Sequence, residues 1–251
     1  MHRLLVDTAC LAKDEPELPR EAQAHLKVVR PKDGEEIELF DGRGSSRIYR
    51  YDFAHKALSA CTKQISQDSS KRGRITLFAC VTKGARWDWT LQKATELGAA
   101  KIVPVISERT IVRLATEERA AKRVRWQRVA EEAARQSHSL WIPDIAEPVD
   151  FSEALAMARE TVCFAGALVT PPPASLLDAA AAACSGDGAC AKEYSVFIGP
   201  EGDFSPDELK RLLEFAHAAS FGSQVLRAET AAIYALAVLN AVLARQAVYM
   251  V

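Results

Sequence analysis

The residues whose types and spacing most clearly suggest chemistry are Gly199-Pro200-Glu201-Gly202, which directly follow the apolar run ending at Ile198. Open α/β sheets bind ligands at the carboxyl ends of their strands, and this turn is expected at such an end. The glycines allow a ligand to approach the backbone closely, whereas the Glu201 carboxylate would repel a phosphate. Neither GxxxxGK[ST] nor GxGxxG occurs in the chain. The turn therefore favours a ligand with hydroxyls, an amine or a positive centre; the alternative is a plain strand-to-helix turn.

A second candidate loop, GSQVLRAET at 222–230, leads into the apolar helix expected from TAAIYALAVLNAVLARQ. Two consecutive strand-to-helix loops are expected to lie side by side at one edge of the sheet. Arg227 and Glu229 place two charges immediately ahead of a helix that has no polar face. They could serve a ligand, or Glu229 could cap the helix while Arg227 forms a salt bridge, and periodicity alone favours the second interpretation.

The elements that position these loops are strands alternating with helices from Arg74 onward, which predicts an α/β fold with a mostly parallel sheet. Continuous apolar runs predict buried strands at 75–81, 101–107, 162–168 and 194–198. The expected helices are 88–98, 116–136, 205–219 and 230–246, with a weakly structured connection at 170–193 and a short strand at 221–226.

The N-terminal residues have a different pattern, in which apolar residues alternate on both sides of a DGRGSS turn. This alternation predicts a β-hairpin within a small β-rich unit. The polar, serine-rich stretch QISQDSSKRGR follows and is expected to be a linker. We therefore expect two domains, one at 1–70 and the other at 71–251.

Charge is unevenly distributed along a chain whose net charge is −1. Residues 71–135 contain 15 lysines and arginines against 7 aspartates and glutamates, an excess that is typical of phosphate contact or of solvated helix faces. The six cysteines have no metal-ligand spacing, so no metal site is expected. The chain contains no signal-peptide core and no run of 18 apolar residues, which favours a cytoplasmic protein without a membrane span.

Four blocks of sequence together carry a resemblance to a known family. IGPEGDFSPDEL followed by VLRAETAAIYAL is similar to the C-terminal half of the RsmE family of ribosomal RNA methyltransferases, which belong to the SPOUT class. The family's N-terminal domain resembles the block HLKVVRPKDGEEIELFDGRG. Its central strand–helix–strand resembles KGARWDWTLQKATELGAAKIVPVISERT, and the end of one of its helices resembles AEEAARQS. The blocks stand in the family's order and cover nearly the whole chain.

The resemblance implies a SPOUT-type, mostly parallel sheet with a C-terminal trefoil knot, preceded by a small PUA-like β-barrel domain that binds RNA. It implies S-adenosyl-L-methionine as cofactor and a homodimer formed through the knot region. The implied activity is methylation of N3 of a specific uridine in 16S ribosomal RNA, with 16S rRNA or the small ribosomal subunit as partner.

The resemblance also assigns residues. The implied cofactor-binding residues are Ala165, Gly166, Ile198, Gly199, Pro200, Glu201, Gly202, Phe221, Gly222, Val225, Leu226, Thr230 and Ala231. The implied RNA-binding residues are Arg3, Arg30, Arg43, Lys83, Arg86, Arg109 and Arg135. As catalytic residues we expect Arg227 and Glu229. Arg227 would stabilise negative charge on the base carbonyls, and Glu229 would either accept the N3 proton or cap the helix.

The chain departs from the family pattern at three places, one of which is Ser223-Gln224, where the family more often has a Pro-Arg-like pair. Asp203 stands where the family often has glycine, and SHSLW at 137–141 stands where it tends to have Gly-Arg-Asn-Arg-like residues, which puts RNA contacts there in doubt. One alternative is methylation of a ribose hydroxyl, as other SPOUT enzymes perform. Another is an RNA-binding or ribosome-assembly protein that has lost catalysis.

Overall fold

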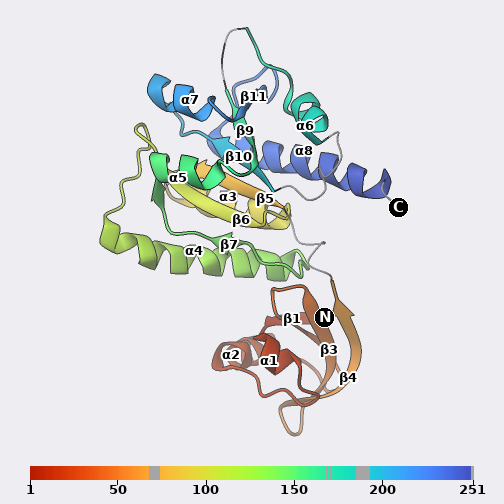
Figure 1. Ribbon diagram of the computed structural model, residues 1–251. Coiled ribbons are helices and arrows are strands. Elements are labelled where there is room, and N and C mark those ends of the chain that lie inside the picture. Colours follow the sequence, from red (N-terminus) through yellow and green to blue (C-terminus); the bar gives the residue numbers. More distant parts are fainter. Residues whose placement is uncertain (68–73, 168, 170, 185–192, 250–251) are drawn as a thin grey trace. The chain divides into compact units, whose positions relative to one another are not determined.

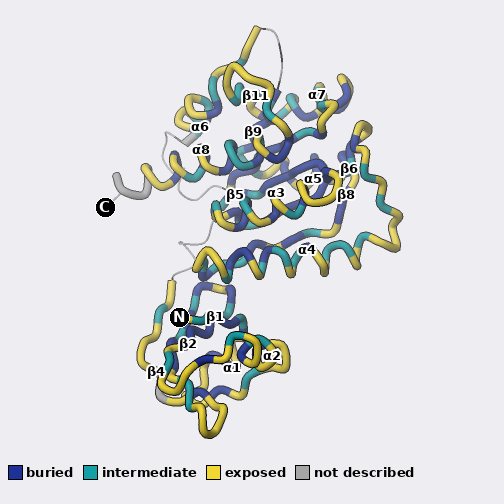
Figure 2. The backbone as a smooth tube through the Cα atoms, turned by 180° about the vertical axis from the view of Figure 1, so that it is seen from behind, coloured by how far each residue is buried: buried dark blue, intermediate teal, exposed yellow. Residues whose placement is uncertain are grey.

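The computed structural model describes residues 1–67, 74–167, 169, 171–184 and 193–249. The chain forms two compact units (Figure 1), of which the first comprises Met1–Arg72 with Glu131–Ile142 and the second Gly73–Ala130 with Pro143–Val251. Figure 2 shows that the strands of the second unit are mostly buried, whereas β4 of the first unit and many residues of helices and loops are exposed. Each unit has a hydrophobic core of its own.

The first unit is built on a four-stranded sheet in the order β1-β2-β3-β4. Its elements are β1 (His2–Leu5), α1 (Thr8–Leu11), α2 (Arg20–Val29), β2 (Glu36–Phe40), β3 (Ser45–Asp52) and β4 (Ala57–Ser66). The β1 strand runs parallel to β2, and the other neighbours are antiparallel. The pairing of β2 with β3 around the DGRGSS turn confirms the predicted hairpin.

Residues 139–142 pack onto this hairpin turn. The Gly44 amide donates to the Leu140 carbonyl at 2.9 Å, and the Ile142 amide donates to the Gly42 carbonyl at 3.0 Å. Both glycines have positive φ, and a Cβ on either would lie 2.5 Å from the side chain of Ile142 or Trp141. The SHSLW segment, where the family tends to have arginines, thus gives this unit apolar packing.

A buried ion pair lies at the centre of the same unit. The Arg3 Nε atom is 3.1 Å from Glu38 Oε2, and the two side chains are only 3% and 7% exposed. The Arg3 guanidinium also donates to the Ala134 carbonyl at 2.8 Å and lies over the Phe40 ring at 3.9 Å. Burial lowers the pKa of Arg3, while Glu38 opposes that shift. An arginine so enclosed cannot reach a phosphate, so Arg3 is a structural residue instead of the expected RNA contact.

The second unit contains a seven-stranded sheet whose pairings are all parallel, which confirms the predicted α/β fold class. Its order is β11-β9-β10-β5-β6-β7, with β8 also paired to β6. The strands are β5 (Ile75–Cys80), β6 (Lys101–Ile106), β7 (Asp144–Ile145), β8 (Val149–Asp150), β9 (Val162–Gly166), β10 (Tyr194–Ile198) and β11 (His217–Ala219).

Helices cover both faces of this sheet (Figure 1). They are α3 (Ala85–Glu96), α4 (Thr116–Gln136), α5 (Phe151–Ala158), α6 (Leu176–Cys184), α7 (Pro206–Leu212) and α8 (Ala228–Tyr249). The α5 and α7 helices pack with Phe78, Phe197 and Phe204 in one core cluster. The α8 helix packs on α3, α6, β5 and β10. By length and composition alone α8 could cross a membrane, but 44% of its apolar window is buried inside the unit, which accounts for much of that apolarity.

Three sequence predictions differ from the structure. The helix expected over 205–219 ends at Leu212, because His217–Ala219 pairs with β9 as β11, and tertiary pairing overrides the helix propensity of alanine. Residues 221–226, expected to be a strand, are irregular. Part of the expected weak connection is α6, while 168, 170 and 185–192 lie outside the described residues.

Two buried thiols give a first prediction, which concerns pH. Burial raises the pKa of Cys80 from its ordinary value of 9.0 to about 11 and that of Cys163 to about 12. Both thiols ionise less readily in the folded protein than in the unfolded chain. Their contribution to the free energy of unfolding is therefore fully present below pH 9 and is lost as the pH rises through 11 to 12. At pH 8 we expect iodoacetamide to leave both thiols unmodified in the native protein and to label them in denaturant.

Peptide mass spectrometry measures this labelling, with glutathione in the same solution as the rate reference. Labelling of Cys80 or Cys163 in the native protein at the glutathione rate would contradict the burial of these thiols.

Candidate active site

A cavity of about 290 Å³ lies where β9, β10 and β11 end and α8 begins. Three loops line it, each leaving the carboxyl end of a parallel strand, which is where α/β sheets bind ligands. The lining residues are Gly166, Ala167, Phe197, Ile198, Gly199, Pro200, Glu201, Asp203, Ala219, Ser220, Phe221, Gly222, Gln224, Val225, Leu226, Arg227, Ala228 and Ala231.

The sheet order changes how the two predicted loops meet. The β10 and β11 strands are not neighbours, because β9 lies between them. The loops therefore flank the end of β9, which contributes Gly166 and Ala167 to the cavity. The sequence predicted that the loops after β10 and β11 would be neighbours, whereas in the structure the loop after β9 lies between them.

The first loop, Gly199–Asp203, closes tightly before α7. The Asp203 amide donates to the Pro200 carbonyl at 2.9 Å, and Asp203 has a φ of 58°. Glycine adopts this left-handed conformation at least cost, which gives a physical reason for the family's preference at this position; aspartate tolerates it better than most residues. The Asp203 Oδ1 atom accepts from the Phe204 amide at 2.7 Å. A Cβ on Gly199 would lie 3.1 Å from that oxygen, so space at Gly199 is limited.

The segment after β6 holds this loop from outside the cavity. The Arg109 guanidinium donates to the Gly202 carbonyl at 2.8 Å. Glu208, part of the capping box that begins α7, accepts from the Glu108 amide at 2.8 Å. Gly202 faces Arg109 and does not line the cavity. Arg109, expected to contact RNA, therefore holds the loop in place while the residue itself remains exposed.

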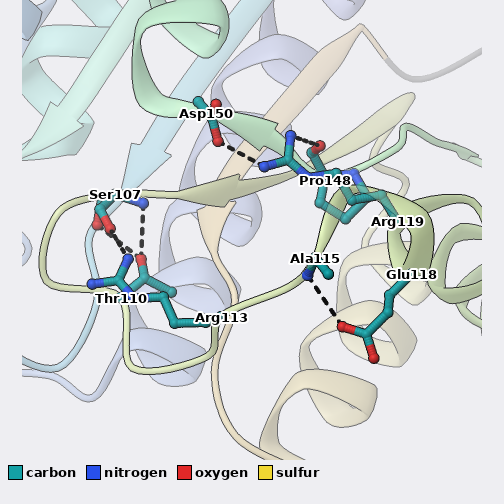
Figure 3. A network of polar contacts seen from close by, with 8 residues as sticks. All are labelled: Ser107, Thr110, Arg113, Ala115, Glu118, Arg119, Pro148 and Asp150. Carbon is teal, nitrogen blue, oxygen red and sulfur yellow. Dashed lines mark hydrogen bonds and ion pairs between the residues drawn. The ribbon is translucent and has the colours of Figure 1, made fainter.

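The same segment is fixed by its own polar contacts (Figure 3). Arg113 donates to the Ser107 carbonyl at 3.2 Å, and Ser107 and Thr110 hydrogen-bond through their hydroxyls at 2.8 Å. Further along, Arg119 donates to the Pro148 carbonyl and to Asp150, the latter at 2.9 Å. These contacts fix the segment that carries Arg109, and Arg109 in turn holds the first loop.

An ion pair stands at the wall of the cavity. Arg86 Nη1, from the first turn of α3, lies 2.9 Å from Glu201 Oε1. The two side chains are 49% and 33% exposed, so solvent reaches both. The pair connects a lining carboxylate to Arg86, which the family resemblance implies as an RNA contact.

The second loop presents an aromatic ring and a free cation to the cavity. The Phe221 ring lies 5.6 Å from that of Tyr234, and a Cβ on Gly166 would lie 2.7 Å from the Phe221 ring. Only glycine leaves room for the ring at that position. Arg227 lines the cavity and is exposed, and within the described residues its guanidinium makes no ion pair.

Several predicted site residues lie elsewhere. Glu229 is 6% exposed and does not line the cavity, and its Oε2 atom is buried without a hydrogen-bond partner. Thr230 is exposed outside the cavity, and Ala165 is buried within β9. Glu229 is thus not part of the cavity lining in this structure, and its place in the first turn of α8 fits the helix dipole.

The remaining expected RNA contacts are distributed over both units. Lys83 and Arg86 are exposed in the second unit, and Arg30 and Arg43 are exposed in the first. Arg135 is half-buried and pairs with Glu132 at 2.6 Å. Among residues whose placement is described, no three His, Cys, Asp or Glu side chains form a metal-binding group.

Sequence reasoning missed part of the lining. Most of the missed residues are next to predicted ones in the sequence, so the ends of the predicted strands would have suggested them. Ala219 and Ser220 depend on β11, a segment that the sequence predicted as part of a helix. The missed residues are Ala167, Phe197, Asp203, Ala219, Ser220, Gln224 and Ala228.

Comparisons with known proteins agree with this fold. Residues 69–240 match the RNA methyltransferase domain family, which covers most of the second unit and places the chain among RNA methyltransferases. Ribosomal RNA small subunit methyltransferase E of Synechocystis is 29% identical, covering 88% of this chain and 72% of its own length. Its counterpart in Aquifex aeolicus is 32% identical over 66% of this chain and 67% of its own.

A solved structure extends the likeness over both units. Ribosomal RNA small subunit methyltransferase E from Neisseria gonorrhoeae, bound to S-adenosyl methionine, is 28% identical and superposes with a TM-score of 0.77. The alignment covers 99% of this chain and 98% of that one. The chain belongs to the ribosomal RNA small subunit methyltransferase E family, as the four sequence blocks predicted.

Proposed function

We propose that this chain transfers the methyl group of S-adenosylmethionine to N3 of a specific uridine in 16S ribosomal RNA. The observation that carries the proposal is the cavity at the ends of β9, β10 and β11, built by loops of a chain in this family. The Neisseria gonorrhoeae relative, which binds S-adenosyl methionine, supports the cofactor. N3 of uridine as the acceptor is carried over from the family resemblance.

The cavity suits this cofactor chemically. Gly166, Gly199 and Gly222 bring the backbone close to the cavity, and Phe221, Val225 and Leu226 offer apolar surface to an adenine. Glu201 supplies a negative charge that is compatible with a sulfonium or an amine and unfavourable to a phosphate. When bound, S-adenosylmethionine supplies an electrophilic methyl group.

The chain's own residues then have to orient the acceptor base. Alignment of reacting atoms at about 3–3.5 Å accounts for much of the rate in such transfers. Arg227, an unpaired cation at the cavity, is placed to hydrogen-bond the uracil carbonyls as negative charge develops on them. Lys83, Arg30 and Arg43 remain available for RNA phosphates because all three are exposed.

We extend the proposal to the fold. The chain reaches β11 after β10 by passing β9, and α8 then returns to pack on β5 and β10, which supports a trefoil knot in this region. The four-stranded first unit supports a PUA-like RNA-binding domain at 1–70, with the methyltransferase domain at 71–251.

We also propose a cytoplasmic homodimer that forms through α8. Thr230, Ala237, Ala241 and Ala244 are all exposed and recur at spacings of three to seven residues along one side of the helix. Small side chains allow close helix packing, and an otherwise apolar helix favours covering that side with a second copy of the chain.

The proposed function is tested by methyl transfer with purified protein. Small ribosomal subunits from a strain lacking the protein are incubated with S-adenosylmethionine carrying a labelled methyl group, and the nucleosides are separated after digestion. Label in 3-methyluridine supports the proposal. Label in a 2′-O-methylated nucleoside, or no label although the cofactor binds by calorimetry, would contradict it.

The Gly166 position gives a direct prediction about cofactor binding. The Gly166→Ala variant should bind S-adenosylmethionine about 10-fold more weakly, because its Cβ lies 2.7 Å from the Phe221 ring and displaces that ring within the cavity. Isothermal titration calorimetry measures the affinity. The control is Gly202→Ala, a substitution outside the cavity at a position without positive φ, where the Cβ would lie 3.7 Å from Arg109 in ordinary contact. Equal affinity for Gly166→Ala and the wild type would show that the ring does not contribute to the site.

A further inference from the structure

The ion pair between Arg86 and Glu201 lies at the wall of the cavity. The Arg86 Nη1 and Glu201 Oε1 atoms lie 2.9 Å apart, and the two residues come from different segments, the first turn of α3 and the loop after β10. Glu201 lines the cavity and Arg86 does not. The arginine thus fixes one oxygen of a carboxylate that faces the ligand cavity.

The proposed reaction, on which this inference rests, needs a proton acceptor. N3 of uridine carries a proton, so its lone pair becomes available for attack only as that proton leaves. An acceptor must lie within hydrogen-bond reach of N3, and N3 must itself lie next to the transferred methyl group. The acceptor is therefore expected among groups that line the cavity.

Within the described chain, the carboxylates that line the cavity are Glu201 and Asp203, and no histidine lines it. Asp203 Oδ1 is engaged by the Phe204 amide at 2.7 Å, and this contact turns the carboxylate onto its own loop. Glu229, the acceptor expected from the sequence, is buried outside the cavity. Glu201 is one-third exposed, and the Arg86 contact engages Oε1 and leaves Oε2 for another partner.

We propose that Glu201 accepts the N3 proton and that Arg86 is the positioning residue that orients its carboxylate. The N3–H bond breaks as the proton moves to Glu201 Oε2. The N3–CH₃ bond forms while the S–CH₃ bond breaks. The electron pair of the broken bond stays on sulfur, so the sulfonium becomes a neutral thioether. Arg227 balances charge on the carbonyls in the same step, so acid–base work and charge stabilisation fall to different residues.

The test uses the Glu201→Gln variant of the full chain with small ribosomal subunits as substrate. The amide keeps the size of the side chain and a hydrogen bond but cannot take a proton, so we expect kcat to fall about 10²- to 10⁴-fold. Calorimetry should give an affinity for S-adenosylmethionine within about 10-fold of the wild type, because one partly exposed carboxylate beside a cationic cofactor is neutralised. Glu96→Gln is the matched control, because Glu96 is 36% exposed and paired with Lys93 at 2.8 Å but lies outside the cavity. Its kcat should equal that of the wild type.

Subunits reconstituted with 5-fluorouridine in 16S RNA give a readout that a structural role would not move. Fluorine makes N3–H more acidic and reduces the need for an acceptor, so it should restore most of the lost kcat in Glu201→Gln and change the wild type little. Wild-type turnover of Glu201→Gln at saturating S-adenosylmethionine, or the same fluorine effect in both proteins, would overturn the assignment.

The role of Arg86 is tested by combining variants. If Arg86 acts through Glu201, Arg86→Gln lowers kcat in the wild type but adds little in the Glu201→Gln background. An equal rise in KM for the ribosomal subunit in both backgrounds would instead make Arg86 an RNA contact and contradict the positioning role. Failure of the proposed function is seen separately, because the wild type would then form no 3-methyluridine.

Discussion

The Arg227→Ala variant should lose about 10²- to 10³-fold in kcat while it binds S-adenosylmethionine as tightly as the wild type. Arg227 lines the cavity and is exposed, and its guanidinium is engaged by no carboxylate among the described residues. Such a cation contributes most when negative charge develops on the base in the transition state, and contributes little to binding of the cofactor. Single-turnover kinetics with saturating cofactor, together with calorimetry, measure the two effects separately.

Two further variants sharpen this result. Arg227→Lys keeps the positive charge but loses the forked geometry, so it should fall between the wild type and Arg227→Ala. Arg159→Ala removes an exposed arginine of the same unit that is 4.0 Å from Glu214 and outside the cavity, and it should retain full activity. Undiminished turnover of Arg227→Ala would remove the residue from the reaction.

The second large effect is expected on stability, in the Arg3→Met variant. The methionine side chain takes the close partner away from the buried Glu38 carboxylate, which is 7% exposed and keeps only a 3.8 Å approach to the exposed His138 among the described residues. Breaking such a buried pair from one side costs about 3–5 kcal/mol. We therefore expect amide hydrogen exchange in β1 and β2 to accelerate strongly, as measured by mass spectrometry of peptides from the first unit.

The double variant Arg3→Met with Glu38→Leu provides the control, since it removes both charges and should recover most of the lost stability. If the Arg3→Met variant has wild-type amide hydrogen exchange but binds ribosomal RNA more weakly, Arg3 contacts RNA, as the sequence analysis expected. Equal instability of the single and double variants would show that the packing of Arg3 on Phe40 matters more than its charge.

The sequence located the cavity well because its determinants are local. Gly199–Gly202 and Gly222–Arg227 each follow an apolar strand and precede a helix, and strand ends in a parallel sheet converge at one edge. The order of the strands was not predictable in the same way. The chain places β9 between β10 and β11, so the two loops flank a third instead of adjoining each other.

Roles of charged residues were harder to predict, because their partners are distant in sequence. Arg109 donates to the carbonyl of Gly202, and Arg3 to that of Ala134, and no periodicity signals such contacts. Glu229 has the right type and spacing for catalysis, but the first turn of α8 buries it. Conversely, the Arg86–Glu201 pair joins two motifs that the sequence had assigned to RNA and to cofactor.

The central claim is that this chain methylates N3 of a uridine in 16S ribosomal RNA, and nucleoside mass spectrometry in a strain lacking the protein tests it most directly. The account predicts that 3-methyluridine disappears from 16S RNA in that strain, returns with the wild-type gene, and does not return with Arg227→Ala. An unchanged level of 3-methyluridine in the strain, with another methylated nucleoside lost in its place, would contradict the account.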